Sequence, residues 1–202
     1  ICEKAKPNEG HQAIVDLEKI FQNRFYLITQ NVDGLHQRAG SSPDKIFSIH
    51  GTLDFMRCGD LCTSELFPFP AIRKDREENF LESEILQLKC PNCGEFARPN
   101  VLWFDEIYNE LFYQSETTVR IANESGLLII VGTSGSTTLP SIIFSNAIKN
   151  NIPIIDINTH ENPFSKSLNN YEKGFSIQAE SALALKEILD LMTKHSTQQK
   201  SN

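Results

Sequence analysis

Apolar residues recur along this chain at two spacings, one typical of helices and one typical of buried strands. Between Asn8 and Arg24 they follow each other at steps of three and four residues, which predicts an amphipathic helix with one face on a sheet. Short apolar runs predict extended segments at 25–29, 46–49, 101–104, 127–131, 152–157 and 175–178, the last as an edge strand. Further helices are expected near 108–123, from about Pro140, and over 181–194, before a frayed tail from His195. This alternation predicts an α/β fold, a Rossmann-like doubly wound parallel sheet.

The stretch from Leu53 to Pro99 interrupts this alternation. It contains four cysteines, several prolines and a charged run at 73–78, which together break any long regular pattern. We therefore expect a small inserted module over residues 54–99. Residues 1–53 and 100–202 would form the larger Rossmann-like domain.

The cysteines of this module have the spacing of metal ligands. Cys90 and Cys93 are two residues apart in a knuckle, and Gly94 permits the tight turn that such a knuckle needs. Cys58 and Cys62 supply the second pair, with three intervening residues where two are usual. Four thiolates favour a closed tetrahedral Zn²⁺ site that braces the fold, and the alternative is four unligated cysteines in a loop-rich segment.

Length and charge narrow the class of protein. A chain of 202 residues with 40% hydrophobic and 22% charged residues is ordinary for a globular protein with one core and a small satellite module. The net charge of -7 argues against direct nucleic-acid binding, which needs a basic face. The longest apolar runs are too short to cross a bilayer, and no secretory signal can be read. Cysteines at metal spacing fit a reducing, cytoplasmic location.

Polar residues follow the first predicted strand and include candidates for ligand binding. Gln30, Asn31 and Asp33 offer amides and a carboxylate that suit sugar hydroxyls and a carboxamide, at the strand end where open α/β sheets bind ligands. On their own they are also ordinary loop residues. His50 ends the second strand, where an imidazole of near-neutral pKa can take a hydroxyl proton, although a lone histidine there is often structural.

Two later strand ends carry further candidates. Residues 132–136 follow a buried strand and precede a helix, so their amides and hydroxyls are able to cradle a phosphate or ribose. This signal is weak alone, because glycine turns are common. Asn158 ends another strand and can bond ribose hydroxyls, or it can act as an ordinary cap.

Taken together and in order, these motifs resemble the sirtuins, a family of NAD-dependent protein-lysine deacylases. The matching positions are 29–36, His50-Gly51, the two cysteine pairs, 98–106, 132–134 and 157–158. The resemblance covers nearly the whole chain. It implies a Rossmann-like large domain, a small zinc module and a binding cleft between them.

The resemblance also implies a role for each matching residue near the reaction. His50 would be the general base that activates a ribose hydroxyl of NAD after nicotinamide departs. Asn31 and Asp33 would line the nicotinamide pocket and hold the leaving group, so that Asn31 counts with His50 as catalytic. Gln30 would hold the adjoining ribose. The products would be free lysine, nicotinamide and O-acyl-ADP-ribose.

The remaining roles concern the substrate and the rest of the cofactor. Leu102 and Phe104 would contact the acylated lysine of a protein substrate, with the Leu102 carbonyl accepting from the amide that is cleaved. The phosphates and the adenosine ribose would be bound by Gly132, Thr133, Ser134 and Asn158.

The chain also departs from the family pattern. The glycine-rich element that opens the sirtuin fold is absent, so we expect the larger C-terminal part of a sirtuin, with weak NAD binding and low activity. Asp105 stands where the family usually has glycine, and the loop 132–140 is one residue longer than usual. The alternatives are a sirtuin-type protein ADP-ribosyltransferase and a non-catalytic zinc-module interaction protein. Acyl preference, protein substrates and oligomeric state are not encoded in these motifs.

Overall fold

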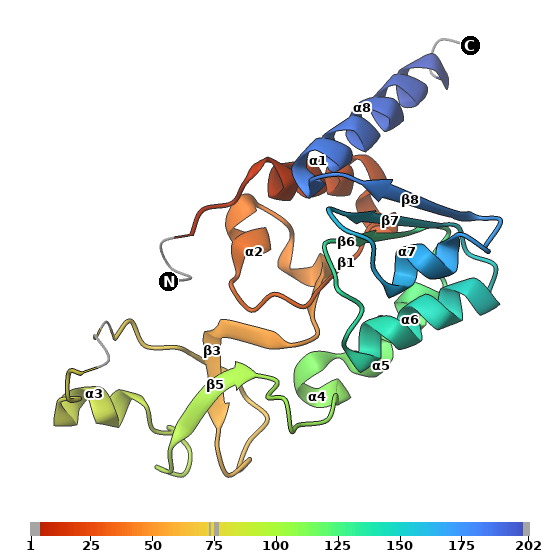
Figure 1. Cartoon of the computed structure of the whole chain (residues 1–202). Coiled ribbons are helices and arrows are strands. Elements are labelled where there is room, and N and C mark those ends of the chain that lie inside the picture. Colours follow the sequence, from red (N-terminus) through yellow and green to blue (C-terminus); the bar gives the residue numbers. More distant parts are fainter. Residues whose placement is uncertain (1–4, 73, 75–76, 200–202) are drawn as a thin grey trace.

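Strands and helices alternate through most of the computed structural model, which describes residues 5–72, 74 and 77–199 (Figure 1). Two of its sheets are parallel. In one, β1 (Leu27–Thr29) pairs with β2 (Ile46–Ser48). In the other, β6 (Leu128–Val131), β7 (Ile154–Asn158) and β8 (Gly174–Gln178) pair in that order. The predicted α/β fold with parallel strands is confirmed, and β8 lies at an edge as expected.

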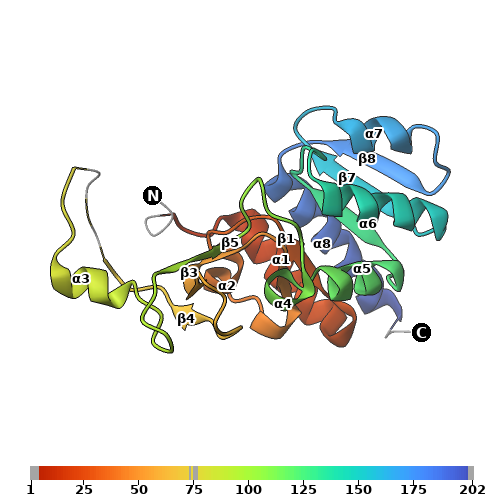
Figure 2. The same cartoon turned by 90° about the horizontal axis from the view of Figure 1, so that it is seen from below.

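Helices cover both faces of the β6–β7–β8 sheet, because its apolar residues alternate between the two sides (Figure 1). On one face α1 (Glu9–Phe21) and α8 (Ser181–Gln199) lie side by side in both views (Figures 1 and 2) and pack against Ile157. On the other face α6 (Thr138–Lys149) and α7 (Pro163–Leu168) pack against Ile154. Helices on both faces are the layering expected of a doubly wound sheet.

The beginning of α1 is set by a side-chain cap. Asn8 has an extended backbone, and its side chain accepts a hydrogen bond of 3.2 Å from the backbone N–H of His11. Ala13 and Leu17 then fall on the buried face, where they meet Leu185 and Ile188 of α8. The apolar spacing read from the sequence is therefore the packing stripe of this helix.

The single helix predicted over 108–123 is wrong, because the structure contains two. Helix α4 (Glu110–Tyr113) ends at Gln114, whose backbone is left-handed with φ 49°, and α5 (Ser115–Asn123) follows. The Glu110 carboxylate accepts hydrogen bonds from the first N–H groups of α5, at 2.8 Å from Glu116. This local cap stabilises the break, which apolar periodicity does not register.

Other boundaries differ by smaller amounts. The extended segment predicted over 101–104 lies mostly earlier, since β5 (Ala97–Val101) ends at Val101. Helix α6 begins two residues before Pro140, and α8 continues to Gln199 although the sequence predicts a frayed tail from His195. The short elements α2 (Leu35–Ala39), η2 (Gln22–Arg24) and η3 (Pro43–Lys45) were not predicted.

The cysteine-containing part forms an antiparallel sheet of its own. β3 (Gly51–Cys58) pairs with β4 (Phe67–Pro68) on one side and with β5 on the other, and α3 (Glu82–Gln87) lies far from the parallel sheets in both views (Figures 1 and 2). The predicted module boundaries, 53/54 and 99/100, fall inside β3 and β5. The division at these residues therefore stays a prediction.

Two features of the sequence fall wholly or partly on residues outside the described ranges. Cys2 and part of the charged run at 73–78 fall among residues that the structure does not describe. Within the described ranges, every helix is too short or too polar to cross a membrane.

Candidate functional site

The carboxyl ends of β1 and β6 are joined by the side chain of Gln30. Its Nε2 donates to the hydroxyl of Thr133 at 2.9 Å, and its Oε1 accepts from the hydroxyl of Thr137 at 2.8 Å. Both threonines follow β6, about a hundred residues later in the chain. One carboxamide thus ties together two strand ends, at the edge where α/β sheets bind their ligands.

Asn158, at the end of β7, extends this group to a third strand. Its Nδ2 donates to the carbonyl oxygen of Thr133 at 2.9 Å. Gly132 adopts a left-handed backbone with φ 63° and donates its N–H to Ile157 at 2.9 Å. Ser134 is exposed, and its hydroxyl lies 2.6 Å from that of Ser136. The structure therefore brings Gly132, Thr133 and Asn158 to the same edge as Gln30.

Both ring nitrogens of His50 have hydrogen-bond partners, and one of these partners is Gln30. Nδ1 lies 3.0 Å from the carbonyl oxygen of Gln30, and Nε2 lies 2.7 Å from the hydroxyl of Tyr108. A carbonyl can only accept, so Nδ1 carries the proton and Nε2 is left as an acceptor. Burial lowers the pKa of His50, and the bond to Gln30 opposes this only in part. The ring is therefore neutral near pH 7 and able to take a proton at Nε2.

The backbone after His50 brings β5 against the imidazole. Gly51 has φ 79°, and a Cβ at this position would lie 1.8 Å from the carbonyl oxygen of Asn100, so only glycine fits. Past this contact, the N–H of Leu102 donates to the carbonyl oxygen of His50 at 2.9 Å. Leu102 thus lies beside His50, whereas the side chain of Phe104 is fully exposed.

Asn31 and Asp33 lie in a different recess. They border a small pocket together with Thr29, Ser48 and Thr52. The N–H of Asn31 donates to the Thr29 hydroxyl at 3.1 Å, and the Asp33 carboxylate accepts from the N–H of Leu35 at 3.0 Å. Asn31 and Asp33 therefore share this recess, whereas the side chain of Gln30 faces Thr133 and Thr137.

A larger cavity of about 710 Å³ separates β1 from β6. Its walls come mainly from α1, β1, α5 and β6 and the segments that flank the strands, and Gln30 and Thr133 form part of its lining. Its size falls within the range of ligand sites, roughly 300–1,000 Å³. The polar group described above therefore borders a cavity.

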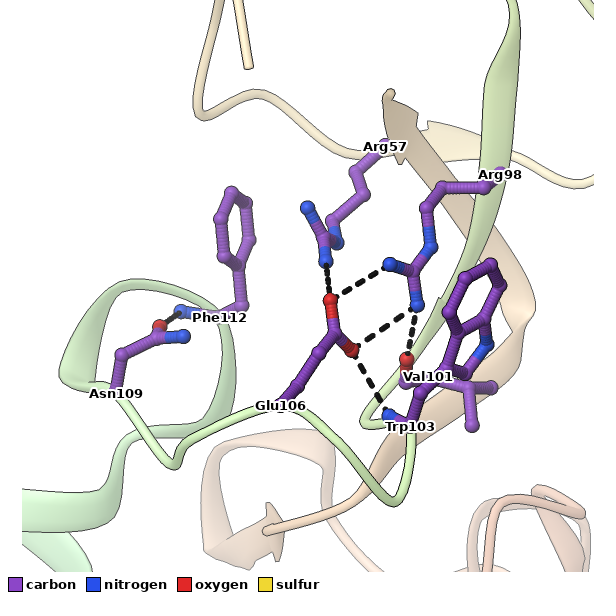
Figure 3. A network of polar contacts seen from close by, with 7 residues as sticks. All are labelled: Arg57, Arg98, Val101, Trp103, Glu106, Asn109 and Phe112. Carbon is purple, nitrogen blue, oxygen red and sulfur yellow. Dashed lines mark hydrogen bonds and ion pairs between the residues drawn. The ribbon is translucent and has the colours of Figure 1, made fainter. Parts of the chain in front are cut away.

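The loop that contains Leu102 and Phe104 is held by an ion-pair network (Figure 3). The Glu106 carboxylate accepts from Arg57 at 2.8 Å, from Arg98 at 2.6 and 3.1 Å, and from the N–H of Trp103 at 2.8 Å. The Arg98 guanidinium also lies over the Trp103 ring, 3.5 Å from its centroid. This network joins β3 and β5 to the loop 102–106.

The charge of Glu106 is favoured by these partners. Burial raises the pKa of Glu106, but the hydrogen bonds from Arg98 and from the N–H of Trp103 outweigh it, so the pKa lies below its usual value. Arg57 is buried, with 7% of its side chain exposed. The carboxylate thus compensates a positive charge that has little access to water.

The four thiols of the cysteine module converge as predicted. All four sulfur atoms lie within 4.8 Å of one another, with 3.6 Å between those of Cys58 and Cys93 and between those of Cys62 and Cys90. A tetrahedral Zn²⁺ with bonds of about 2.3 Å places its sulfurs roughly 3.8 Å apart. Hydrogen bonding among the thiols, with Cys93 foremost, raises the pKa of Cys62. Four sulfur donors at these separations fit Zn²⁺.

Several residues of this region were not singled out from the sequence. Tyr108 and Thr137 touch predicted site residues. Thr137 belongs to the polar loop 132–140 but was not singled out within it, and Tyr108 belongs to no motif. Arg57 lies within the cysteine module and carried no motif. Arg98 and Glu106 belong to the segment 98–106 that resembles the sirtuins, so that segment was the only available signal.

Comparison with known proteins places the chain in a family. The family model described as "Sir2 family" matches residues 1–138. An NAD-dependent protein deacylase of Leptospira interrogans (strain 56601) is 35% identical over 191 residues, which is 94% of this chain and 71% of the relative. A protein of the same description from Aquifex aeolicus (strain VF5) is 36% identical over 167 residues, covering 81% of this chain and 62% of that relative.

Solved structures agree with this placement. A Sir2 homologue in complex with NAD superimposes with a TM-score of 0.73 at 28% identity, over 96% of this chain and 68% of that one. A structure described as a Sir2–p53 peptide–NAD⁺ complex has a TM-score of 0.73 at 22% identity, which shows the fold alone. The matched length, the shared fold and the four-cysteine cluster agree, and the chain belongs to the Sir2 family, the sirtuins.

Proposed function

We propose that this sirtuin chain is an NAD-dependent protein-lysine deacylase that yields nicotinamide, free lysine and O-acyl-ADP-ribose. The observation that carries the proposal is the convergence of His50, Gln30, Thr133 and Asn158 at one edge of the parallel strands. The names of the curated relatives, NAD-dependent protein deacylases, support the reaction. The likeness to a Sir2 homologue that binds NAD supports the cosubstrate.

Residues at the ends of different strands bind different parts of NAD. Gly132, Thr133, Ser134 and Asn158 bind the phosphates and the adenosine ribose, as backbone N–H groups and short polar side chains at strand ends commonly do. Gln30 holds the second ribose next to His50. Asn31 and Asp33 bind the nicotinamide carboxamide in the neighbouring recess.

The chemistry begins with the acyl group of the substrate. Its amide oxygen attacks the anomeric carbon of the ribose, and the bond to nicotinamide breaks as nicotinamide leaves. Asn31 and Asp33 favour this step by holding the leaving group in place. His50 then accepts the proton of a ribose hydroxyl at Nε2, and the freed oxygen attacks the imidate carbon. Hydrolysis of that adduct releases the lysine amine and leaves the acyl group on ADP-ribose.

The acylated lysine is bound by the loop after β5. The Leu102 carbonyl accepts from the N–H of the amide that is cleaved, and Phe104 contacts the acyl-lysine from an exposed position. The network around Glu106 holds this loop against the cysteine module. We assign residues 54–99 to a zinc module whose metal, held by the four cysteines, stabilises the fold without taking part in the reaction.

The products of the reaction test this proposal. An acetyl-lysine peptide and NAD are incubated with this chain, and in parallel with the longest natural form of the protein that contains it. The mass spectrum is expected to contain nicotinamide, deacetylated peptide and O-acetyl-ADP-ribose in equal amounts. ADP-ribose attached to protein, with the acetyl group left on the peptide, would instead indicate an ADP-ribosyltransferase. If neither form consumes NAD, the proposal is wrong.

A further inference from the structure

His50 has a hydrogen-bond partner that the reaction does not use. The Tyr108 hydroxyl lies 2.7 Å from Nε2, the atom that accepts the ribose proton in the proposed reaction. Because Nδ1 donates to the carbonyl oxygen of Gln30, Nε2 presents a lone pair and Tyr108 is the donor. The tyrosine hydroxyl therefore makes the same bond to Nε2 that a ribose hydroxyl would make.

Packing keeps Tyr108 at this position. The residue follows Glu106 on the segment between β5 and α4, and its ring packs against a buried cluster formed by Ile49, Ala122, Leu139 and Ile143. The Tyr108 and His50 rings lie 5.8 Å apart at an interplanar angle of 33°. A ring held by this cluster stays in place when only its hydroxyl is removed.

The hydroxyl also keeps its proton at neutral pH. Burial raises the pKa of Tyr108, and the neighbouring Thr137 side chain opposes this only in part. Thr137 in turn donates to Gln30, the proposed ribose-binding residue. Tyr108 thus belongs to the polar group that would have to rearrange when a sugar enters.

We propose that the Tyr108 hydroxyl occupies Nε2 of His50 when NAD is absent and must yield this nitrogen to the ribose hydroxyl of NAD. The inference rests on the proposed function, since it assumes that NAD is the substrate. Tyr108 acts through His50 and is not itself a catalytic residue. Its hydroxyl competes with the sugar for one hydrogen bond, so each binding event breaks the bond to Tyr108.

Replacing Tyr108 by phenylalanine tests this competition. A neutral hydrogen bond of this kind corresponds to about a two- to tenfold change in an equilibrium constant. Tyr108→Phe is therefore expected to lower the dissociation constant and the KM for NAD by about two- to tenfold, with kcat nearly unchanged. AMP lacks the second ribose, so its affinity should be the same in both proteins.

Tyr171→Phe is the matched control. It removes a tyrosine hydroxyl that is also bonded, at 2.7 Å to the carbonyl oxygen of Ile152, but that lies in the separate cluster of α6 and α7. This variant should leave the KM for NAD unchanged. An unchanged or higher KM for NAD in Tyr108→Phe, or a loss confined to kcat, would overturn the inference.

A second measurement does not depend on NAD. Nitrogen-15 NMR of the chain itself, with the His50 signals assigned by comparison with His50→Ala, reports which ring nitrogen carries the proton. We expect a protonated Nδ1 and a hydrogen-bonded, unprotonated Nε2 whose signal shifts in Tyr108→Phe. A protonated Nε2, or a signal indifferent to Tyr108, contradicts the contact. If NAD is consumed but Tyr108→Phe has no effect, only this inference fails, whereas absence of any NAD turnover refutes the proposed function.

Discussion

Replacing Glu106 by glutamine should destabilise the protein well beyond the effect of an ordinary surface ion pair. The carboxylate accepts bonds from Arg57, Arg98 and the N–H of Trp103 (Figure 3). Glutamine keeps the shape but removes the charge, and it turns an NH₂ group towards two guanidinium groups that cannot accept a hydrogen bond. The positive charge of buried Arg57 is then left without its partner.

The size of the effect follows from burial. Removing one partner of a buried ion pair costs about 3–5 kcal/mol, and Glu106 falls at the lower end of this range because 26% of its side chain is exposed. We therefore expect a loss of about 3 kcal/mol in the free energy of unfolding, a large share of the roughly 5–15 kcal/mol of a typical domain. At about 2–4 °C per kcal/mol, the melting temperature falls by roughly 6–12 °C.

Urea unfolding of Glu106→Gln, compared with Glu124→Gln, measures this difference. Glu124 pairs with Arg120 at 3.5 Å on an exposed helix surface, so its loss should cost less than about 0.5 kcal/mol. Because the folded-state pKa of Glu106 is lowered, its contribution is present above the unfolded-state value and disappears as pH falls through the folded one. This reasoning would be refuted if Glu106→Gln and Glu124→Gln lost equal free energies of unfolding. It would also be refuted if Glu106→Gln were still destabilising in strong acid.

Three further predictions concern the metal, the glycine and the pH dependence. Chelation of zinc, or the substitution Cys90→Ser, should lower the melting temperature while the protein that stays folded forms the same products. An unchanged melting temperature would argue against a structural metal. Gly51→Ala should cost at least about 2 kcal/mol in unfolding experiments, because φ 79° and a Cβ 1.8 Å from an oxygen are both unfavourable, while Gly126→Ala, with open space around it, should be nearly neutral. The ratio kcat/KM should fall as pH drops through the pKa of His50, which burial holds below 6.5, since only the neutral ring accepts a proton; an acid limb above that value would contradict the assignment.

The main helices and strands of this fold could be predicted from the sequence because they depend on the local spacing of apolar residues. Spaced apolar residues predicted α1, and continuous apolar runs predicted β1, β6 and β7. The break at Gln114 was missed, because it depends on a left-handed backbone and on a side-chain cap that apolar spacing does not record.

The site was readable only in part, for a related physical reason. Strand ends suggested Gln30 and Asn158, and cysteine spacing suggested the metal cluster. The bond from Gln30 to Thr133 and the bond from His50 to Tyr108 join residues that are 103 and 58 positions apart. Contacts between loops at such separations follow from tertiary packing, which a single sequence does not specify.

The role of His50 is the central claim, and it is tested most directly by separating the two halves of the reaction. With His50→Ala, exchange of labelled nicotinamide into NAD in the presence of acetylated peptide should persist, because that step precedes the proton transfer. Formation of O-acetyl-ADP-ribose should fall by roughly 10²–10⁴-fold, the usual contribution of a general base. If the variant forms that product as fast as the unaltered protein, His50 is not the base and the proposed mechanism is wrong.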